Sequence, residues 1–198
     1  MDVIGVDHIY LAVSDFAPSE AFYDPVMRAL GFFKSDRPIG GERHAHYFNR
    51  VLQISIRPAR SVRAHDPYAP GLHHLCLQVA TPADVDAAYA SVRGLGIAAT
   101  LPRTYPEYST DYYATFFVDP DGIRLEIVAR RQMRDDIVRA WDQLRSFVNP
   151  LQELQRERAP SDGKTRLLGH DANSEDLIQR AGEGRRRPLP RRSTAVRT

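Results

Sequence analysis

Cysteine is nearly absent from the sequence: Cys76 is the only one in the 198-residue chain, so no disulfide can form within it. A chain without disulfides fits a reducing compartment, and we expect a cytoplasmic protein. No apolar run approaches the ~18 residues that a membrane-spanning helix needs. Residues 1–4 also lack the basic and apolar segments of a secretory signal. We therefore predict that the chain has no membrane partner.

The net charge is also small, at +2, and it is unevenly distributed. Residues 156–198 contain 11 Lys and Arg against 6 Asp and Glu, which leaves the rest of the chain mildly acidic. An acidic folded region argues against a nucleic-acid surface. Residues 134–151 have apolar side chains on one side of a predicted amphipathic helix. Beyond residue 156 this periodicity is lost, and we predict a disordered basic tail.

Two short segments of matching pattern organise the rest of the chain. His8–Val13 and His74–Val79 each begin with a histidine. In both segments every second residue is an aliphatic one, Ile, Leu or Val. A strand with this alternation packs one face on a helix and turns the other face toward solvent or a cavity. The repetition predicts a duplicated module.

A helix and three further strands are expected after each of these segments. Helix-start signals stand at Asp15 and Thr81, and apolar residues at helical spacing follow until a glycine. We therefore predict an α+β fold in which two paired βαβββ modules, residues 4–58 and 71–130, form a cleft-enclosing mixed sheet. Together these modules make one domain over residues 4–130.

The segment Asp119–Gly122 sets the register of the last two strands. Its Asp-Pro-Asp-Gly sequence suits a type I turn whose glycine adopts the left-handed conformation. A loop of this length pairs Asp119 with Ile123, and hence Phe116 with Glu126.

Four polar residues then fall at related positions. When the strands around Gln53 and Glu126 are aligned through their flanking Leu and Ile residues, Gln53 corresponds to Glu126 as His8 corresponds to His74. Two imidazoles and a carboxylate on strands can hold a divalent ion and leave positions open for water or substrate. We predict His8, His74 and Glu126 as ligands and Gln53 as a fourth, neutral one. A merely solvated polar face is the alternative interpretation.

Further side chains share this polar face or lie in the aromatic loop over residues 105–113. We predict that they contact a small-molecule substrate: Tyr10, Tyr105, Tyr112, Phe116 and Arg124.

Three segments resemble the vicinal oxygen chelate superfamily, namely Val6–Val13, Gly71–Leu75 and Asp119–Glu126. That group includes glyoxalase I, fosfomycin-resistance enzymes, extradiol dioxygenases and bleomycin-resistance proteins. The resemblance covers about residues 4–130 and implies paired βαβββ modules and a divalent ion, Zn, Ni, Mn or Fe. The metal ligands that it implies are His8, His74 and Glu126.

The chain departs from individual members of this group. Gln53 stands where glyoxalase I has a carboxylate, and neither the extra histidine of the dioxygenases nor the potassium and phosphonate loop of the fosfomycin enzymes is evident. The leading hypothesis is a glyoxalase-like lyase or isomerase that chelates vicinal oxygens and stabilises an enolate, with Glu126 as the catalytic residue. An Fe(II) extradiol dioxygenase and a non-catalytic drug-binding protein of the bleomycin-resistance type are the alternatives. The sequence leaves open whether modules pair within one chain or between the copies of a homodimer.

Overall fold

The computed structural model of the chain describes residues 3–61 and 63–158. The predicted basic tail therefore lies, from residue 159 onward, outside the described residues. No helix within the described ranges is long and apolar enough to cross a membrane.

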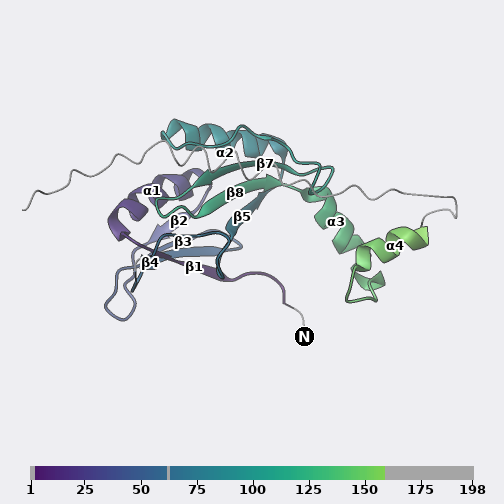
Figure 1. The fold of residues 1–198 in the computed structure, drawn as a ribbon, viewed down its shortest axis with the longest axis horizontal. Coiled ribbons are helices and arrows are strands. Elements are labelled where there is room, and N and C mark those ends of the chain that lie inside the picture. The colour runs from purple at the N-terminus through teal and green to yellow at the C-terminus, as the bar shows by residue number, and fades with distance from the viewer. Residues whose placement is uncertain (1–2, 62, 159–198) are drawn as a thin grey trace, which may run out of the picture. The chain divides into compact units, whose positions relative to one another are not determined.

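The first module consists of β1 (His8–Val13), α1 (Phe16–Ala29), β2 (Phe33–Ser35), β3 (Ala45–Phe48) and β4 (Gln53–Pro58). Its four strands form one sheet in the order β1-β4-β3-β2 (Figure 1). The first and last strands, β1 and β4, run parallel, whereas the other neighbours run antiparallel.

The second module repeats this plan with β5 (His74–Val79), α2 (Pro82–Gly94), β6 (Arg103–Thr104), β7 (Tyr113–Val118) and β8 (Arg124–Ala129). Its sheet has the order β5-β8-β7-β6, and β5 and β8 are again parallel. The predicted α+β fold of two βαβββ modules is confirmed.

Both long helices begin at the residues that the sequence indicates. The Asp15 carboxylate accepts a hydrogen bond from the N–H of Ala17 at 3.2 Å. Thr81 and Asp84 form a capping box at the start of α2, in which each side chain accepts from the backbone N–H of the other residue. These caps satisfy N–H groups that would otherwise lack partners in the first turn of each helix.

The hydrophobic core takes the alternate strand residues that the pattern predicts to face the helices. They include Leu11, Val13, Ile54, Ile56, Leu75, Leu125 and Ile127. Burial of each such side chain contributes about 1.5–3 kcal/mol of hydrophobic free energy. The opposite face of each sheet is left to carry the polar residues.

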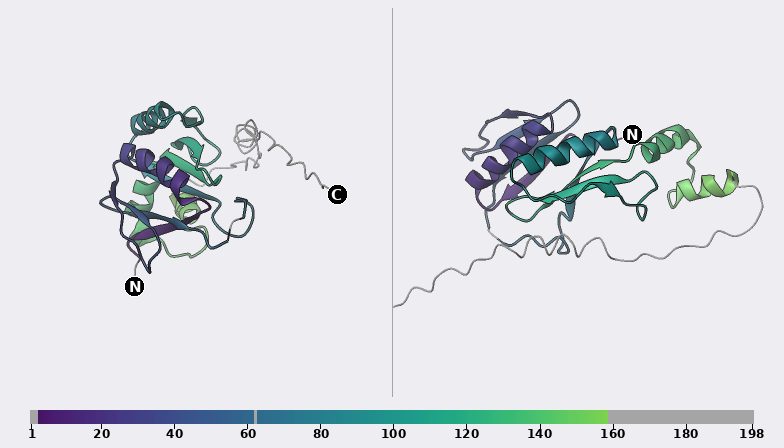
Figure 2. Two further views of the ribbon diagram at one scale, coloured as in Figure 1. Left: turned by 90° about the vertical axis from the view of Figure 1, so that its left-hand side faces the viewer. Right: turned by 90° about the horizontal axis from the view of Figure 1, so that it is seen from above.

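The two modules meet through α1 and α2, which lie side by side (Figures 1 and 2). The ring centroids of Phe22 and Phe117 are 6.5 Å apart. The hydroxyl of Tyr23 donates a 2.8 Å hydrogen bond to Asp119 in the second module. Within the described ranges no ladder joins the two sheets, so each sheet keeps its own edges.

The register predicted for the last hairpin is confirmed. Phe116 pairs with Glu126, and the N–H of Asp119 donates to the carbonyl of Ile123 at 3.0 Å. Gly122 has a φ of 89°, the left-handed conformation that the turn requires.

The predicted C-terminal helix is present but does not run over all of 134–151. The structure has α3 (Arg131–Ala140), a short 3₁₀ turn η1 (Trp141–Gln143) and then α4 (Pro150–Arg158). Pro150 disfavours a helical conformation in the residue before it, and Asn149 has a φ of 51°. Apolar periodicity alone did not indicate this break.

We predict that Asp119 is a main link between the modules. It is 5% exposed and accepts hydrogen bonds from the Tyr23 hydroxyl and from the N–H groups of Ile123 at 2.7 Å and Asp121 at 3.0 Å. Replacement by alanine leaves these buried donors unpaired, so Asp119→Ala should lower the free energy of unfolding by about 3 kcal/mol in urea titrations. Tyr23→Phe should cost about 1 kcal/mol.

The matched control is Tyr113→Phe, which removes a phenol that donates to Asp86 at an exposed position. An exposed hydrogen bond exchanges readily with water, so little change is expected. Equal losses from Tyr23→Phe and Tyr113→Phe would contradict the proposed importance of the buried link.

Candidate metal centre

The second module brings together an imidazole and a buried carboxylate. His74 leads β5, Glu126 lies on the parallel neighbour β8, and His74 Nε2 is 3.3 Å from Glu126 Oε2. Glu126 is only 2% exposed, although it lies on the face opposite the helices. The side chains of His74 and Glu126 are thus close enough to bind the same metal ion.

Tyr112 holds this carboxylate from the other side. Its hydroxyl donates a 2.5 Å hydrogen bond to Glu126 Oε1. Burial, followed by this hydrogen bond, raises the pKa of Tyr112 above its ordinary value. Tyr112 therefore remains a proton donor, and it leaves Glu126 Oε2 directed at His74.

The spacing of these atoms fits a divalent ion. Two donors bound at about 2.1 Å to a tetrahedral ion lie about 3.4 Å apart. The Nε2–Oε2 separation of 3.3 Å matches that span, and the donor set of imidazole and carboxylate suits Zn²⁺, Mn²⁺ or Fe²⁺. The residues of this module therefore fit the metal that the sequence predicts.

A second set of contacts orients the ring of His74. His73 Nδ1 lies 2.7 Å from His74 Nδ1, and the guanidinium of Arg124 donates to the His73 ring at 3.3 Å. A bond through Nδ1 leaves Nε2 as the metal-binding atom of His74. His73 thus supports the ring, and Arg124 supports His73. A substrate contact for Arg124 stays a prediction.

The first module carries the corresponding candidate residues, His8 and Gln53. His8 pairs directly with Gln53 across the parallel strands β1 and β4. Asp7 Oδ2 lies 2.7 Å from His8 Nδ1, which leaves Nε2 of this half-exposed ring for another partner. Asp7 precedes His8 in the sequence, and this adjacency was the signal that could have identified it.

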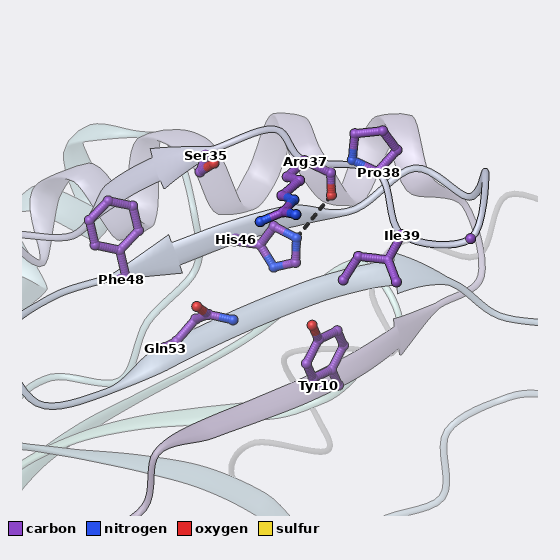
Figure 3. A pocket seen from close by; sticks show the side chains of 9 residues that line it. Tyr10, Ser35, Arg37, Pro38, Ile39, His46, Phe48 and Gln53 are labelled. Carbon is purple, nitrogen blue, oxygen red and sulfur yellow. Dashed lines mark hydrogen bonds between the residues drawn. The ribbon is translucent and has the colours of Figure 1, made fainter.

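A cavity of about 670 Å³ opens beside Gln53 (Figure 3). Tyr10, Arg37, His46 and Phe48 also line it, and a substrate contact for Tyr10 stays a prediction. His46 was missed from the sequence because it approaches Gln53 only after β3 pairs with β4. Arg37 was missed because it lies in the loop between β2 and β3.

A cavity of about 350 Å³ lies beside His74 in the second module. Its lining includes His74, Tyr112, Arg130 and Arg134. The guanidinium of Arg130 lies 5.4 Å from the centre of the Tyr112 ring. Arg130 has no ion-pair partner in the described part of the chain.

The other predicted substrate contacts are buried. Tyr105 is 4% and Phe116 is 7% exposed, and their rings meet edge to face at 5.4 Å. The centroid of the Tyr105 ring also lies 6.4 Å from that of Tyr112, the residue that donates to Glu126. A direct substrate contact for Tyr105 and Phe116 stays a prediction.

The candidate ligands of the two modules do not come together within the described part of one chain. Across residues 3–61 and 63–158 the structure has no group of three or more His, Cys, Asp or Glu side chains that could hold an ion. His8 is therefore not gathered with His74 and Glu126, which agrees with the absence of a ladder between the two sheets.

Strand pairing also changes one predicted equivalence. The β1–β4 ladder pairs Tyr10 with Ser55, and the β5–β8 ladder pairs Cys76 with Glu126. Because Tyr10 and Cys76 are equivalent positions, Ser55 rather than Gln53 corresponds to Glu126. A shift of two residues keeps every side chain on the same face of the strand, so the sequence pattern cannot reveal it.

These features are found in a chain whose family is recognisable. The Glyoxalase/Bleomycin resistance protein/Dioxygenase superfamily has a family model that matches residues 5–127. The chain therefore belongs to this superfamily, the group that its motifs resemble.

Two relatives show how broad this membership is. The uncharacterized protein YaeR of Escherichia coli (strain K12) is 31% identical over 132 residues, which cover 62% of this chain and 93% of YaeR. The 2,2',3-trihydroxybiphenyl dioxygenase of Sphingomonas paucimobilis is 28% identical over 142 residues, or 68% of this chain. The chain spans only 44% of the dioxygenase.

Solved structures agree with the fold. A glyoxylase/bleomycin resistance protein/dioxygenase domain from Frankia sp. EAN1pec has a TM-score of 0.55 at 26% identity, covering 65% of this chain and 98% of that domain. A mutant of the fosfomycin resistance protein FosX from Listeria monocytogenes, complexed with Mn(II), has a TM-score of 0.51 at 19% identity, covering 67% of this chain and 98% of FosX. At that identity the likeness to FosX shows the fold alone.

Proposed function

We propose that the protein is a metal-dependent, glyoxalase-like lyase or isomerase acting on a small molecule with two adjacent oxygens. The observation that carries this proposal is the pair of His74 and Glu126, 3.3 Å apart beside a cavity. A divalent ion would be held by His8, His74 and Glu126. When bound, it would polarise the two oxygens and stabilise the negative charge that develops on them.

The chain's own residues supply the rest of the chemistry. Glu126 is the carboxylate that we assign as proton acceptor, because it is buried and faces the cavity-lining His74. Tyr112 donates to its second oxygen and fixes its orientation. Asp7 and His73 hold the rings of His8 and His74 so that Nε2 of each faces away from its supporting residue.

We further propose that two copies of the chain complete each site. The strands that carry His8 and His74, β1 and β5, each stand at an edge of their sheet. Such an edge presents unpaired backbone N–H and C=O groups to a neighbouring strand. If β1 of one copy lies beside β5 of another, His8 and Gln53 come next to His74 and Glu126 of the second copy.

The substrate in this proposal carries a negative charge. Arg130 is half-buried beside His74 and lacks an ion-pair partner within the described residues, and Arg134 lines the same cavity. A partly buried guanidinium favours a carboxylate or a similar anion.

Extradiol ring cleavage is the second candidate, since a trihydroxybiphenyl dioxygenase is among the relatives. The two-histidine, one-carboxylate set also suits Fe²⁺. A substrate screen of the Mn²⁺-loaded and Fe²⁺-loaded protein, in air and without oxygen, separates the two. Turnover that needs oxygen favours the dioxygenase, and tight binding of a ligand without any metal favours a drug-binding protein.

The first test addresses the ligands themselves. His8→Ala and His74→Ala should each abolish stoichiometric metal binding, because each removes one of three strong donors. Metal content after dialysis against Zn²⁺ or Mn²⁺ measures this, and circular dichroism checks the fold. His65→Ala, in the loop between β4 and β5, is the control and should keep its metal. Full loading of either site variant would reject the shared site.

The second test asks whether two copies build the site. His8→Ala and Glu126→Ala proteins should each lack metal. After unfolding and refolding together, half of the dimers are mixed, and one of the two sites in each mixed dimer is intact. About a quarter of the wild-type metal content should therefore return. A site within one chain would restore none, because every chain then carries a defect.

The third test concerns the charge of the substrate. Oxalate, a dianion with adjacent oxygens, should bind the metal-loaded protein about ten-fold more weakly after Arg130→Gln. Catechol, a neutral compound with adjacent oxygens, should lose much less. Arg131→Gln is the matched control, since Arg131 is exposed and lies 3.5 Å from Asp135. Equal effects on oxalate and catechol would contradict an anion contact.

A further inference from the structure

Gln53 is the last member of a chain of hydrogen bonds that begins in the protein interior. Its Nε2 donates to Ser55 Oγ at 3.0 Å, and Ser55 Oγ lies 2.8 Å from Nδ1 of His46. The other ring nitrogen of His46, Nε2, lies 3.0 Å from the backbone carbonyl of Arg37 (Figure 3). Ser55 is fully buried and His46 is 7% exposed.

The chemistry of these groups fixes the direction of each bond. A carbonyl can only accept, so the proton of the neutral His46 ring is on Nε2. Nδ1 is then an acceptor, and the Ser55 hydroxyl must donate to it. The oxygen of Ser55 is left to accept from the Gln53 amide. The amide oxygen of Gln53, Oε1, is consequently the atom that remains for another partner.

Neighbouring rings and strand pairing hold this arrangement in place. His44 stacks on His46 at 5.7 Å with an angle of 8°, and Tyr10 meets His46 edge on at 6.2 Å. His46 pairs with Ser55 across the antiparallel strands β3 and β4. The side chains that orient Gln53 are thus themselves immobilised by packing.

We propose that Ser55 and His46 are positioning residues that present Gln53 Oε1 to the metal centre. The proposal rests on the proposed function, in which His8, the partner of Gln53 across the ladder, is a ligand. An amide oxygen is a donor for a hard divalent ion, whereas an amide nitrogen offers no lone pair and would direct N–H groups at the cation. Without the interior hydrogen bonds Gln53 can present either end.

The first experiment reads the hydrogen bonds directly, without metal. In the ¹⁵N-labelled full chain, the imidazole of neutral His46 should give the spectrum of the Nε2-protonated tautomer. The side-chain NH₂ signals of Gln53, assigned by their loss in Gln53→Ala, should be protected from exchange and lose that protection in Ser55→Ala. An Nδ1-protonated His46 would overturn the proposal, because Ser55 would then donate to the Gln53 oxygen.

The second experiment measures Mn²⁺ affinity by competition with a chelator. Ser55→Ala should weaken binding about ten-fold, the usual scale for residues that orient a ligand. Gln53→Ala should weaken it at least as much. The double variant should be no weaker than Gln53→Ala alone, since Ser55 acts through Gln53. Additive losses would overturn the proposal.

A matched control separates positioning from loss of stability. Thr115 is also fully buried, and its hydroxyl donates to the carbonyl of Thr100 at 2.7 Å. Thr115 lies on the opposite face of its sheet from Glu126. Thr115→Val should lower stability and leave Mn²⁺ affinity unchanged, and a weakening equal to that of Ser55→Ala would overturn the proposal. If the wild-type chain binds no Mn²⁺, the proposed function is rejected. The spectra of His46 and Gln53 would still show whether the hydrogen bonds orient Gln53 as proposed.

Discussion

The parallel pairing of the first and last strands in each module is the constraint on which the remaining structure depends. It sets β1 beside β4 and β5 beside β8, so residues far apart in sequence become neighbours on one face. A parallel pair requires a crossover, and the helix that supplies it covers the other face. One face of each sheet is thereby committed to the apolar core, and the other is left for polar side chains such as His74 and Glu126.

Much of this arrangement could be predicted from the sequence because it depends on local periodicity. Alternation identified the faces of β1 and β5, and the turn at Asp119 gave the pairing of Phe116 with Glu126. What could not be predicted depends on tertiary packing. The separation of His8 from His74 follows from how α1 and α2 meet, and the approach of His46 to Ser55 follows from the pairing of β3 with β4. A shift of two residues between Gln53 and Ser55 leaves no trace in periodicity.

The candidate metal ligands are held by further polar groups of the same module. Each proposed ligand side chain has a partner: Asp7 for His8, His73 for His74, Tyr112 for Glu126 and Ser55 for Gln53. Two of these partners, Tyr112 and Ser55, are buried, where an unpaired polar atom costs about 1–3 kcal/mol. Glu126 and Gln53 are therefore held by bonds that the fold must satisfy in any case, which limits the ways in which these two side chains can reorient.

The position of β1 and β5 at the sheet edges has a thermodynamic consequence. In the proposed assembly the donors for one ion come from two copies, so occupancy of the ion and association of the chains are linked equilibria. The ion then favours the dimer by the same free energy by which the dimer favours the ion. Dilution of the protein would release metal, and chelation would release subunits, although neither process alters the core of either module.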